Sequence, residues 1–323
     1  MSGRTGPLTG QAARADAARR DRPESADPLR SAFHVDRDRI LRSRAFRRLK
    51  HKTQVFVAPQ GDHFRTRMTH SLEVTALART VSRALGLEED LTEAIGLGHD
   101  IGHAPFGHAG EDALDRASRG HGGQGFSHRD HGLRVVEHLE QDGNGLNLTV
   151  ETRDGIRTHS GPGVPGSLEA AVVRIVDRIA YVGHDIDDAV RADVITAGDL
   201  PAAAGELGGT GIERQQTLLE ALVAESAERG EIALPGGTAS AFDELRNFMF
   251  ERVYLAPPAS EQAARGRRVV AGLVEWYCDD ISRLPKSDGE DDLTRAIDHV
   301  AGMTDRYALD IYERELLPSI AAR

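Results

Sequence analysis

The chain lacks several features on which whole classes of protein depend. It has one cysteine, Cys278, among 323 residues, which excludes a disulfide framework and any zinc ribbon built from cysteines. Aromatic residues make up only 5% of it, and no apolar run approaches the roughly 20 residues of a membrane span. Residues 1–30 also lack the apolar stretch of a secretory signal, so we expect a cytoplasmic protein with no membrane partner.

The apolar content is nevertheless sufficient for a large core. Apolar residues make up 39% and charged residues 28% of the chain, and alanine, leucine, valine and isoleucine supply most of the apolar share, which favours helices. The formal net charge is −11, yet residues 1–65 carry 15 basic residues against 7 acidic ones. This local excess is typical of a solvated basic segment, and it also fits a surface for phosphates or weak binding of single-stranded nucleic acid.

The chain divides into an N-terminal tail and one helical unit. Residues 1–30 are polar, small or arginine-rich without an apolar period, so we predict a flexible basic tail. Helical patterns follow one another through the single unit that we predict over 31–323. The pattern predicts an all-α fold with a core at about 66–190, further C-terminal helices at about 212–323, and at most a short β-hairpin near 53–65.

Residues that bind metals gather in the middle of the chain. His70 begins one predicted helix, and the adjacent pair His99 and Asp100 ends another. Adjacent residues on a helix point about 100° apart, so this pair can share an ion only if other segments close the site. Two packed helices would bring His70 to the pair, and a fourth ligand would have to come from a third helix.

The predicted helix over 168–190 can supply that fourth ligand. One side of it is apolar, whereas Asp177, Tyr181 and Asp185 stack on another side at steps of four residues. An ionised carboxylate beside a core needs a partner, and a metal ion is one. Two imidazoles and two carboxylates form a mixed site that suits Mn²⁺, Fe²⁺, Co²⁺, Ni²⁺ or Zn²⁺ and, less naturally, Mg²⁺.

Five sequence blocks carry a resemblance to a known family. They are residues 43–56 (SRAFRRLKHKTQVF), 65–71 (RTRMTHS), 99–108 (HDIGHAPFGH), 177–185 (DRIAYVGHD) and 301–308 (AGMTDRYA). The order of histidines and aspartates in them resembles the H…HD…D ligand pattern of the HD superfamily of metal-dependent phosphohydrolases. The closer resemblance is to deoxyguanosine triphosphate triphosphohydrolase-like proteins, and it runs from about residue 30 to the C-terminus.

This resemblance implies a fold and an activity. The fold would be an all-α HD-domain bundle with additional C-terminal helices. The activity would be hydrolysis of deoxynucleoside triphosphates (dNTPs), dGTP or a broader set, by metal-activated water that attacks the α-phosphate and releases the deoxynucleoside and inorganic triphosphate. The resemblance further implies one divalent metal ion, a second Mg²⁺ arriving with the substrate, and a homo-oligomer (dimer-based, tetramer or hexamer) that can bind an effector dNTP.

The site residues that the resemblance implies fall into three groups. The metal ligands would be His70, His99, Asp100 and Asp177. The catalytic group beside the α-phosphate would be His108 as general acid, Glu111 to hold its imidazole, His103 and His128. The substrate would be bound by Arg67 and Arg178 at the phosphates and by Gln54, Tyr181 and Asp185 at the deoxyribose. We add Lys52 at the phosphates because its charge could offset that of the triphosphate.

Two other classes of function remain open at this point. The same four metal ligands serve 5′-nucleotidases, phosphodiesterases and alarmone hydrolases. The chain could also bind nucleotides or single-stranded nucleic acid through its basic N-terminal part without hydrolysing anything. Arg67, Tyr181 and Asp185 together favour a deoxynucleoside that bears a phosphate chain, and the intact ligand set favours an enzyme.

Overall fold

The computed structural model describes residues 5–54, 65–255, 259–285 and 290–318, and this part of the chain is helical. Its α-helices are, in chain order, α1 (Ala32–Arg42), α2 (Arg44–Arg48), α3 (Arg67–Leu85), α4 (Glu89–Gly98), α5 (Gly107–Gly120), α6 (His128–Arg134), α7 (Val150–Thr158), α8 (Leu168–Arg191), α9 (Ala202–Leu207), α10 (Gly211–Arg229), α11 (Gly236–Met249), α12 (Ala259–Asp279), α13 (Asp292–Ala301) and α14 (Asp305–Leu316). The described residues form no strand, so the all-α prediction is confirmed. Most of the predicted hairpin near 53–65 lies outside them, and an isolated antiparallel bridge joins Thr53 to Thr66.

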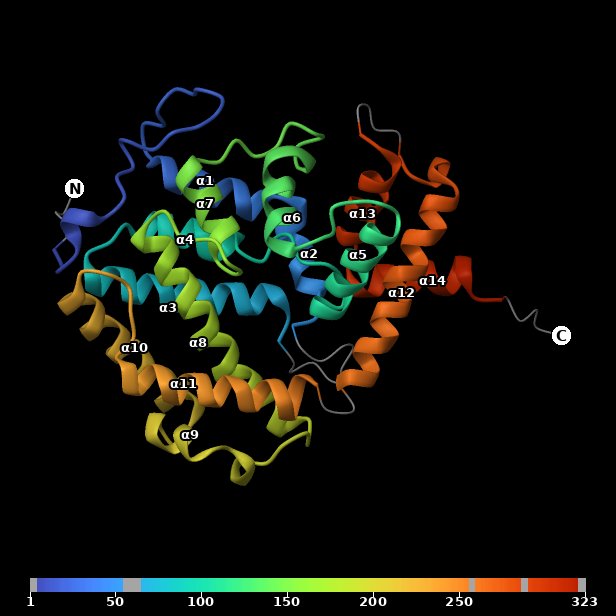
Figure 1. Ribbon diagram of the computed structural model, residues 1–323. Helices are drawn as coiled ribbons and strands as arrows, with labels where there is room; N and C mark the ends of the chain where they lie inside the picture. Colours follow the sequence, from blue (N-terminus) through green and yellow to red (C-terminus); the bar gives the residue numbers. More distant parts are fainter. Residues whose placement is uncertain (1–4, 55–64, 256–258, 286–289, 319–323) are drawn as a thin grey trace.

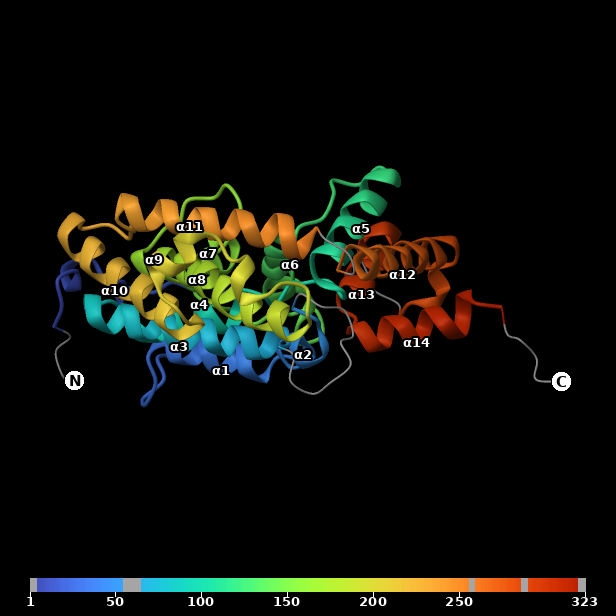
Figure 2. The ribbon, with the colours of Figure 1, turned by 90° about the horizontal axis from the view of Figure 1, so that it is seen from below.

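Three helices that pack against one another form the centre of the molecule. These are α3, α4 and α8, and α1 and α7 both pack on α4. Helix α10 packs on α8 and α3 from another side. Figures 1 and 2 show α5 with α12, α13 and α14 gathered at one end of the molecule, beside this central group. None of the described helices is long and apolar enough to cross a membrane.

Three clusters of buried apolar side chains hold this arrangement. The largest joins α3 and α8 to α10 and α11, and a smaller one joins α1, α2, α4 and α7. The third lies among α5, α12, α13 and α14. The predicted site segments lie at the start of α3, at the end of α4, at the start of α5 and along α8.

Local sequence places the site segments at helix ends. Helix α3 begins with a capping box in which Thr66 and Thr69 satisfy each other's backbone amides, so Arg67 opens the first turn. The turn after α4 passes very close to the start of α6, since a Cβ on Gly102 would lie 2.1 Å from the carbonyl oxygen of His128. Only glycine permits this approach, which brings the segment after α4 and the segment before α6 into one site.

Residues 5–30 differ from the predicted flexible tail. Leu8 is 2% exposed within the largest apolar cluster, and its amide donates a hydrogen bond of 2.9 Å to the carbonyl of Leu85 at the end of α3. Farther along, Arg20 forms an ion pair of 2.6 Å with the buried carboxylate of Asp36. The prediction was wrong for this segment because composition does not show which partners the body of the protein offers to an arginine-rich chain.

We expect Leu8→Ala to lower the free energy of unfolding by about 2–4 kcal/mol, because it removes a buried leucine from a packed core. Leu29→Ala is a matched control in the same segment, since the side chain of Leu29 is 92% exposed. The control should change stability by less than about 0.5 kcal/mol. Urea unfolding of both variants measures the difference, and equal stabilities would show that the N-terminal segment does not pack.

Candidate active site

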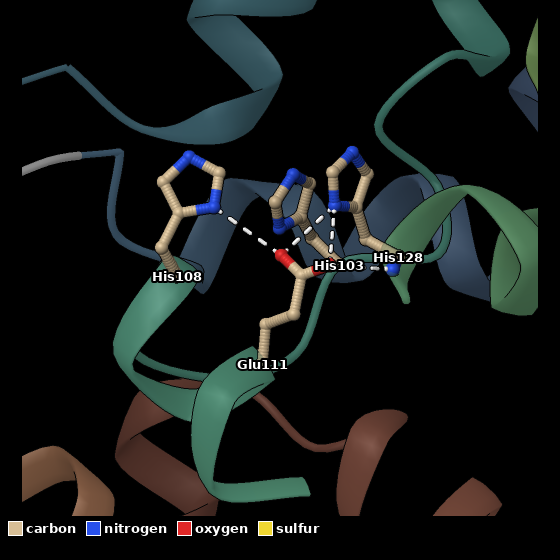
Figure 3. A group of neighbouring side chains, drawn as sticks. All are labelled: His103, His108, Glu111 and His128. Atoms are coloured by element: carbon tan, nitrogen blue, oxygen red, sulfur yellow. Dashed lines mark hydrogen bonds and ion pairs between the residues drawn. The ribbon is translucent and has the colours of Figure 1, made fainter. Parts of the chain in front are cut away.

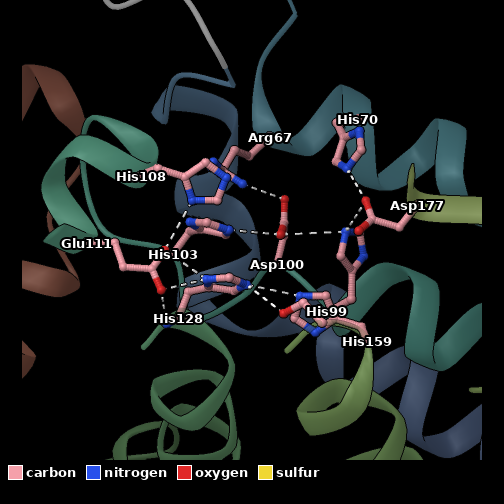
Figure 4. A network of polar contacts seen from close by, with 12 residues as sticks. Arg67, His70, His99, Asp100, His103, His108, Glu111, His128, His159 and Asp177 are labelled. Carbon is pink, nitrogen blue, oxygen red and sulfur yellow. Dashed lines mark hydrogen bonds and ion pairs between the residues drawn. The ribbon is translucent and has the colours of Figure 1, made fainter. Parts of the chain in front are cut away.

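The four residues predicted as metal ligands converge from three helical segments. His70 lies in the first turn of α3, His99 and Asp100 directly follow α4, and Asp177 lies midway along α8 (Figure 4). Nε2 of His70 is 2.9 Å from Oδ1 of Asp177. Nε2 of His99 is 3.6 Å from Oδ1 of Asp100 and 3.7 Å from Oδ1 of Asp177. The structure therefore brings together the group that the sequence pattern proposed.

The orientation of His99 shows that this group fits a divalent cation. Nδ1 of His99 lies 2.7 Å from the carbonyl oxygen of Gly96, which can only accept, so Nδ1 carries the proton. Nε2 therefore presents a lone pair, and it is buried without a hydrogen-bond partner among the described residues. Its neighbours are carboxylate oxygens of Asp100 and Asp177, which are acceptors as well. A buried acceptor among acceptors calls for a cation, and a histidine whose other nitrogen donates to a carbonyl is a usual metal ligand.

Both carboxyl groups of this group are ionised at neutral pH. Burial raises the pKa of Asp177, but the hydrogen bond from His70 and the charges of His99 and His70 together outweigh it and lower this pKa to about 2. Burial likewise raises the pKa of Asp100, but the charges of Arg67, His103 and His99 together outweigh it and hold the pKa well below its usual range. Two carboxylates and two imidazoles are thus available to one ion, with Asp177 the more exposed of the two carboxylates.

A second group of histidines surrounds Glu111, which lies on α5 (Figure 3). Oε2 of Glu111 is 3.2 Å from Nδ1 of His108, and Oε1 accepts hydrogen bonds from Nδ1 of His128 at 2.8 Å and from its backbone amide at 2.9 Å. The ring of His103 stacks on that of His128, with centroids 3.9 Å apart and planes 12° from parallel. The structure thus assembles all four residues of the predicted catalytic group.

Charge differs sharply within this second group. Burial raises the pKa of Glu111, but the hydrogen bonds from His108 and His128 outweigh it, so its pKa lies far below the usual range and the side chain is a carboxylate. Burial and the charge of Arg67 lower the pKa of His103 well below its usual value, so His103 is neutral. His108 is 79% exposed, so its ring is open to a molecule arriving from solvent.

Sequence reasoning missed His159, which ends α7 and is buried beside these residues. Its Nδ1 lies 2.7 Å from the carbonyl oxygen of Ile156, so its Nε2 can only accept. Nε2 of His128 lies 3.1 Å away and also 3.2 Å from the hydroxyl of Ser160. Nδ1 of His128 therefore donates toward Glu111, while its Nε2 faces both the ring of His159 and the hydroxyl of Ser160. Burial and the charges of His128 and His99 lower the pKa of His159 to about 3.

Two of the three basic side chains expected at the phosphates, Arg67 and Lys52, lie in different places. Arg67 is buried, and its Nη1 donates to Oδ2 of Asp100 at 2.8 Å, so it stands between the metal-ligand group and the histidines. Lys52 is also buried, but its ammonium donates to the backbone carbonyls of His103 and Ala301. The structure therefore differs from the phosphate-binding role predicted for Lys52, since these carbonyls hold its ammonium.

Of the residues expected at the sugar, Tyr181 and Asp185 lie on α8, as does Arg178, the third basic residue expected at the phosphates. Asp185 is buried, and its Oδ2 accepts a hydrogen bond of 2.6 Å from the hydroxyl of Tyr254, a second residue that sequence reasoning missed. The carboxamide oxygen of Gln54 is buried without a partner among the described residues. Arg178 is half-buried on α8. The side chain of Tyr181 lies outside the described part, so its predicted role stays a prediction.

Comparison with known proteins agrees with this geometry. Residues 67–182 match the model of the HD domain, and residues 232–314 match that of the phosphohydrolase-associated domain. The fold and the histidine–aspartate site thus define a metal-dependent phosphohydrolase of the HD class. The chain belongs to the family of deoxyguanosinetriphosphate triphosphohydrolase-like proteins.

Three relatives with that name illustrate the similarity. The chain is 46% identical to the protein of Caldanaerobacter subterraneus, over 93% of this chain and 89% of the relative. It is 41% identical to that of Desulfatibacillum aliphaticivorans (93% and 92% covered) and 42% identical to that of Clostridium perfringens (93% and 91% covered). The crystal structure of a hypothetical protein from Aquifex aeolicus matches with a TM-score of 0.50 at 22% identity, over 91% of this chain and 75% of that one, which indicates a shared fold.

We expect purified protein to contain a divalent metal ion that His99→Ala loses, because this substitution removes the buried lone pair that faces Asp100 and Asp177. His138→Ala is the matched control, since His138 is 61% exposed and lies on the chain segment after α6. Elemental analysis of both variants by mass spectrometry, after dialysis without added metal, measures the difference. Full metal content in the His99 variant would contradict the assignment.

Proposed function

We propose that the protein hydrolyses deoxynucleoside triphosphates, dGTP or a broader set, to the deoxynucleoside and inorganic triphosphate. The observation that carries the proposal is that the Glu111 group adjoins the metal-ligand group. His103 connects them, with Nε2 3.2 Å from Oδ1 of Asp100 and its ring stacked on His128. Metal ligands alone are common to HD phosphohydrolases. A set of imidazole donors directly beside them fits the α-phosphate of a longer phosphate chain, which is the substrate that the names of the relatives indicate.

The polar residues of the site have different roles in the proposed hydrolysis. A divalent ion held by His70, His99, Asp100 and Asp177 would activate water for attack on phosphorus. Arg67 places a buried guanidinium beside Asp100, where it meets the negative charge that grows on the phosphate oxygens.

The histidines around Glu111 serve the leaving group. Glu111 holds Nδ1 of His108, which leaves Nε2 on the exposed ring free to give a proton to the departing 5′-oxygen. The carboxylate also stabilises the protonated ring before this transfer. His128 contacts Glu111 through Nδ1 and faces His159 through Nε2, so these two residues fix the orientation of its ring beside the phosphates. On the sugar side, Asp185 offers a carboxylate to the 3′-hydroxyl, and Tyr254 orients that carboxylate.

The product identifies the reaction. We expect ³¹P NMR of dGTP incubated with the Mn²⁺-loaded protein, recorded after the Mn²⁺ has been removed with a chelating resin, to show inorganic triphosphate and neither pyrophosphate nor phosphate, because the proposed attack at the α-phosphorus expels the 5′-oxygen and leaves the bond between the α- and β-phosphates intact. A 5′-mononucleotide and a cyclic dinucleotide serve as comparison substrates. Hydrolysis of either one without release of triphosphate from any dNTP would assign the protein to another class of HD phosphohydrolase.

His108→Ala should lower kcat about 10²–10⁴-fold, because it removes the proton donor for the leaving group. The metal content should stay at the wild-type level, since His108 lies outside the metal-ligand group. His121→Ala is the matched control, a histidine at the end of the same helix whose partner is Glu275. Steady-state rates and elemental analysis test both statements together. Loss of the metal in the His108 variant would make the role of His108 structural.

The remaining expectations from the sequence stay proposals. They are a homo-oligomer, an effector dNTP, a second Mg²⁺ bound with the substrate, weak binding of single-stranded nucleic acid, and a cytoplasmic location. Light scattering after gel filtration, with and without dNTP, tests the first two. Binding to single-stranded DNA should weaken steeply as salt rises if the basic residues before position 65 are responsible.

A further inference from the structure

The block 301–308 contributes to the family resemblance, yet its residues lie outside both the metal-ligand group and the Glu111 group. Asp305 in this block is a buried acid at the first position of α14. Its Oδ2 accepts hydrogen bonds from the backbone amide of Thr53 at 2.9 Å and from the hydroxyl of Thr53, and its Oδ1 accepts one from the amide of Phe106 at 2.9 Å. One carboxylate therefore ties together three segments that are far apart in the sequence.

Lys52 makes a parallel set of contacts beside it. Its buried ammonium donates to the carbonyl of His103 and, at 2.8 Å, to the carbonyl of Ala301. Burial, with the charge of Arg48 adding to it, lowers the pKa of Lys52 to about 7, as expected for an ammonium kept away from water. Lys52 and Asp305 thus both connect the segment that follows α2 with the segment that precedes α5 and with the junction of α13 and α14.

These contacts lie beside a residue with an unfavourable backbone conformation. Phe106 has a φ of 62°, in the left-handed region that a residue with a large side chain rarely adopts. The next residue begins α5, so the conformation of Phe106 sets the direction in which His108 leaves the helix start. Asp305 holds the amide of Phe106 in this conformation. The amide of Arg67 donates to the carbonyl of Lys52 at 3.1 Å, so the same segment also fixes the start of α3.

We propose that Lys52 and Asp305 are positioning residues: together they hold the turn 103–108 against α14, so that His103 and His108 keep their orientation toward the phosphate chain. The inference rests on the proposed function for its catalytic consequence. It makes the C-terminal helices a structural condition for catalysis, because Ala301 and Asp305 are the points at which α13 and α14 contact the turn. It also makes the role of Lys52 positioning of this turn, in place of phosphate binding.

Asp305→Ala removes both acceptors, and we expect kcat for dNTP hydrolysis to fall about 10–100-fold while KM and metal content stay within about twofold of wild type, because misplaced donors cost rate more than binding. Asp305→Asn keeps the shape of the side chain and one acceptor oxygen, so its kcat should lie between that of the wild type and that of Asp305→Ala. Asp310→Ala is the matched control, an exposed acid on the same helix. It should leave kcat unchanged.

Lys52→Met keeps the length of the side chain and removes its donors. Positioning predicts a lower kcat with a nearly unchanged KM, since the carbonyls of His103 and Ala301 lose their partner. A raised KM at unchanged kcat would show that Lys52 binds phosphate directly, and would overturn the proposal for this residue. Steady-state kinetics with one dNTP at saturating metal separates the two outcomes.

A second readout separates this inference from the proposed function. The imidazole NMR signals of His103 and His108, from protein labelled with ¹³C,¹⁵N-histidine, report the ring environment without substrate. We expect them to shift in Asp305→Ala, to shift less in Asp305→Asn and to stay in place in Asp310→Ala. If these shifts occur although the wild type hydrolyses no dNTP, the proposed function fails and the positioning role stands.

Unchanged histidine signals in a folded Asp305→Ala protein would overturn the positioning role, whatever the enzyme hydrolyses. Circular dichroism and thermal unfolding establish that the variant is folded. Should the alanine variant not fold, Asp305→Asn carries the same test, because it preserves the size of the side chain and alters only its hydrogen bonds to Thr53 and Phe106. In that variant unchanged signals and unchanged kcat would likewise contradict the proposal.

Discussion

The arrangement of the site depends on one buried nitrogen lone pair, that of His99 Nε2, which requires a cation beside it. Because Nδ1 is committed to the carbonyl of Gly96, Nε2 points toward the carboxylates of Asp100 and Asp177, and among the described residues it has no donor. Acceptors gathered away from water repel one another until a cation joins them. The packing of α4 against α3 near this site also depends on a glycine. A Cβ on Gly96 would lie 2.6 Å from the hydroxyl oxygen of Thr75, so glycine is what lets α4 approach α3 at this level.

Asp100 connects this metal-ligand group with the histidines around Glu111. One of its oxygens lies near His99 and His103, and the other accepts from the guanidinium of Arg67. Any ion that Asp100 binds therefore shares a carboxylate with Arg67 and His103, which under the proposed function face the phosphates. A chain with a formal charge of −11 has to reverse its field locally to receive a polyphosphate. Under the proposed function, the metal site and Arg67, which share Asp100, would supply that reversal.

Sequence alone was informative where a pattern joined several residues. His99 and Asp100 are adjacent, the helix that carries Asp177 has a clear apolar side, and the five blocks keep their order, so the helical core and its ligands could be predicted. Site residues without other site residues nearby in the sequence could not be predicted in this way. His159 and His99 make the same bond, from Nδ1 to the carbonyl three residues earlier, but only His99 is marked in the sequence by a neighbouring aspartate. Tyr254 carries no neighbouring signal either. Whether a lysine such as Lys52 turns inward to carbonyls or outward to a ligand depends on tertiary packing, which spacing does not encode.

The contacts of the site also cross the boundary between the two matched domains. The HD match ends at residue 182 and contains the metal ligands, Arg67 and the Glu111 group. Tyr254, which contacts Asp185, and Asp305, which holds the turn before α5, both lie within the match to the phosphohydrolase-associated domain. Under the proposed function, the residues that act on the phosphates lie in the first domain. The second domain orients Asp185, which accepts from the sugar, and holds the turn that positions the proton donor His108. Changes in the second domain can then alter which substrates are accepted, or how fast they react, without disturbing the ligands that hold the metal.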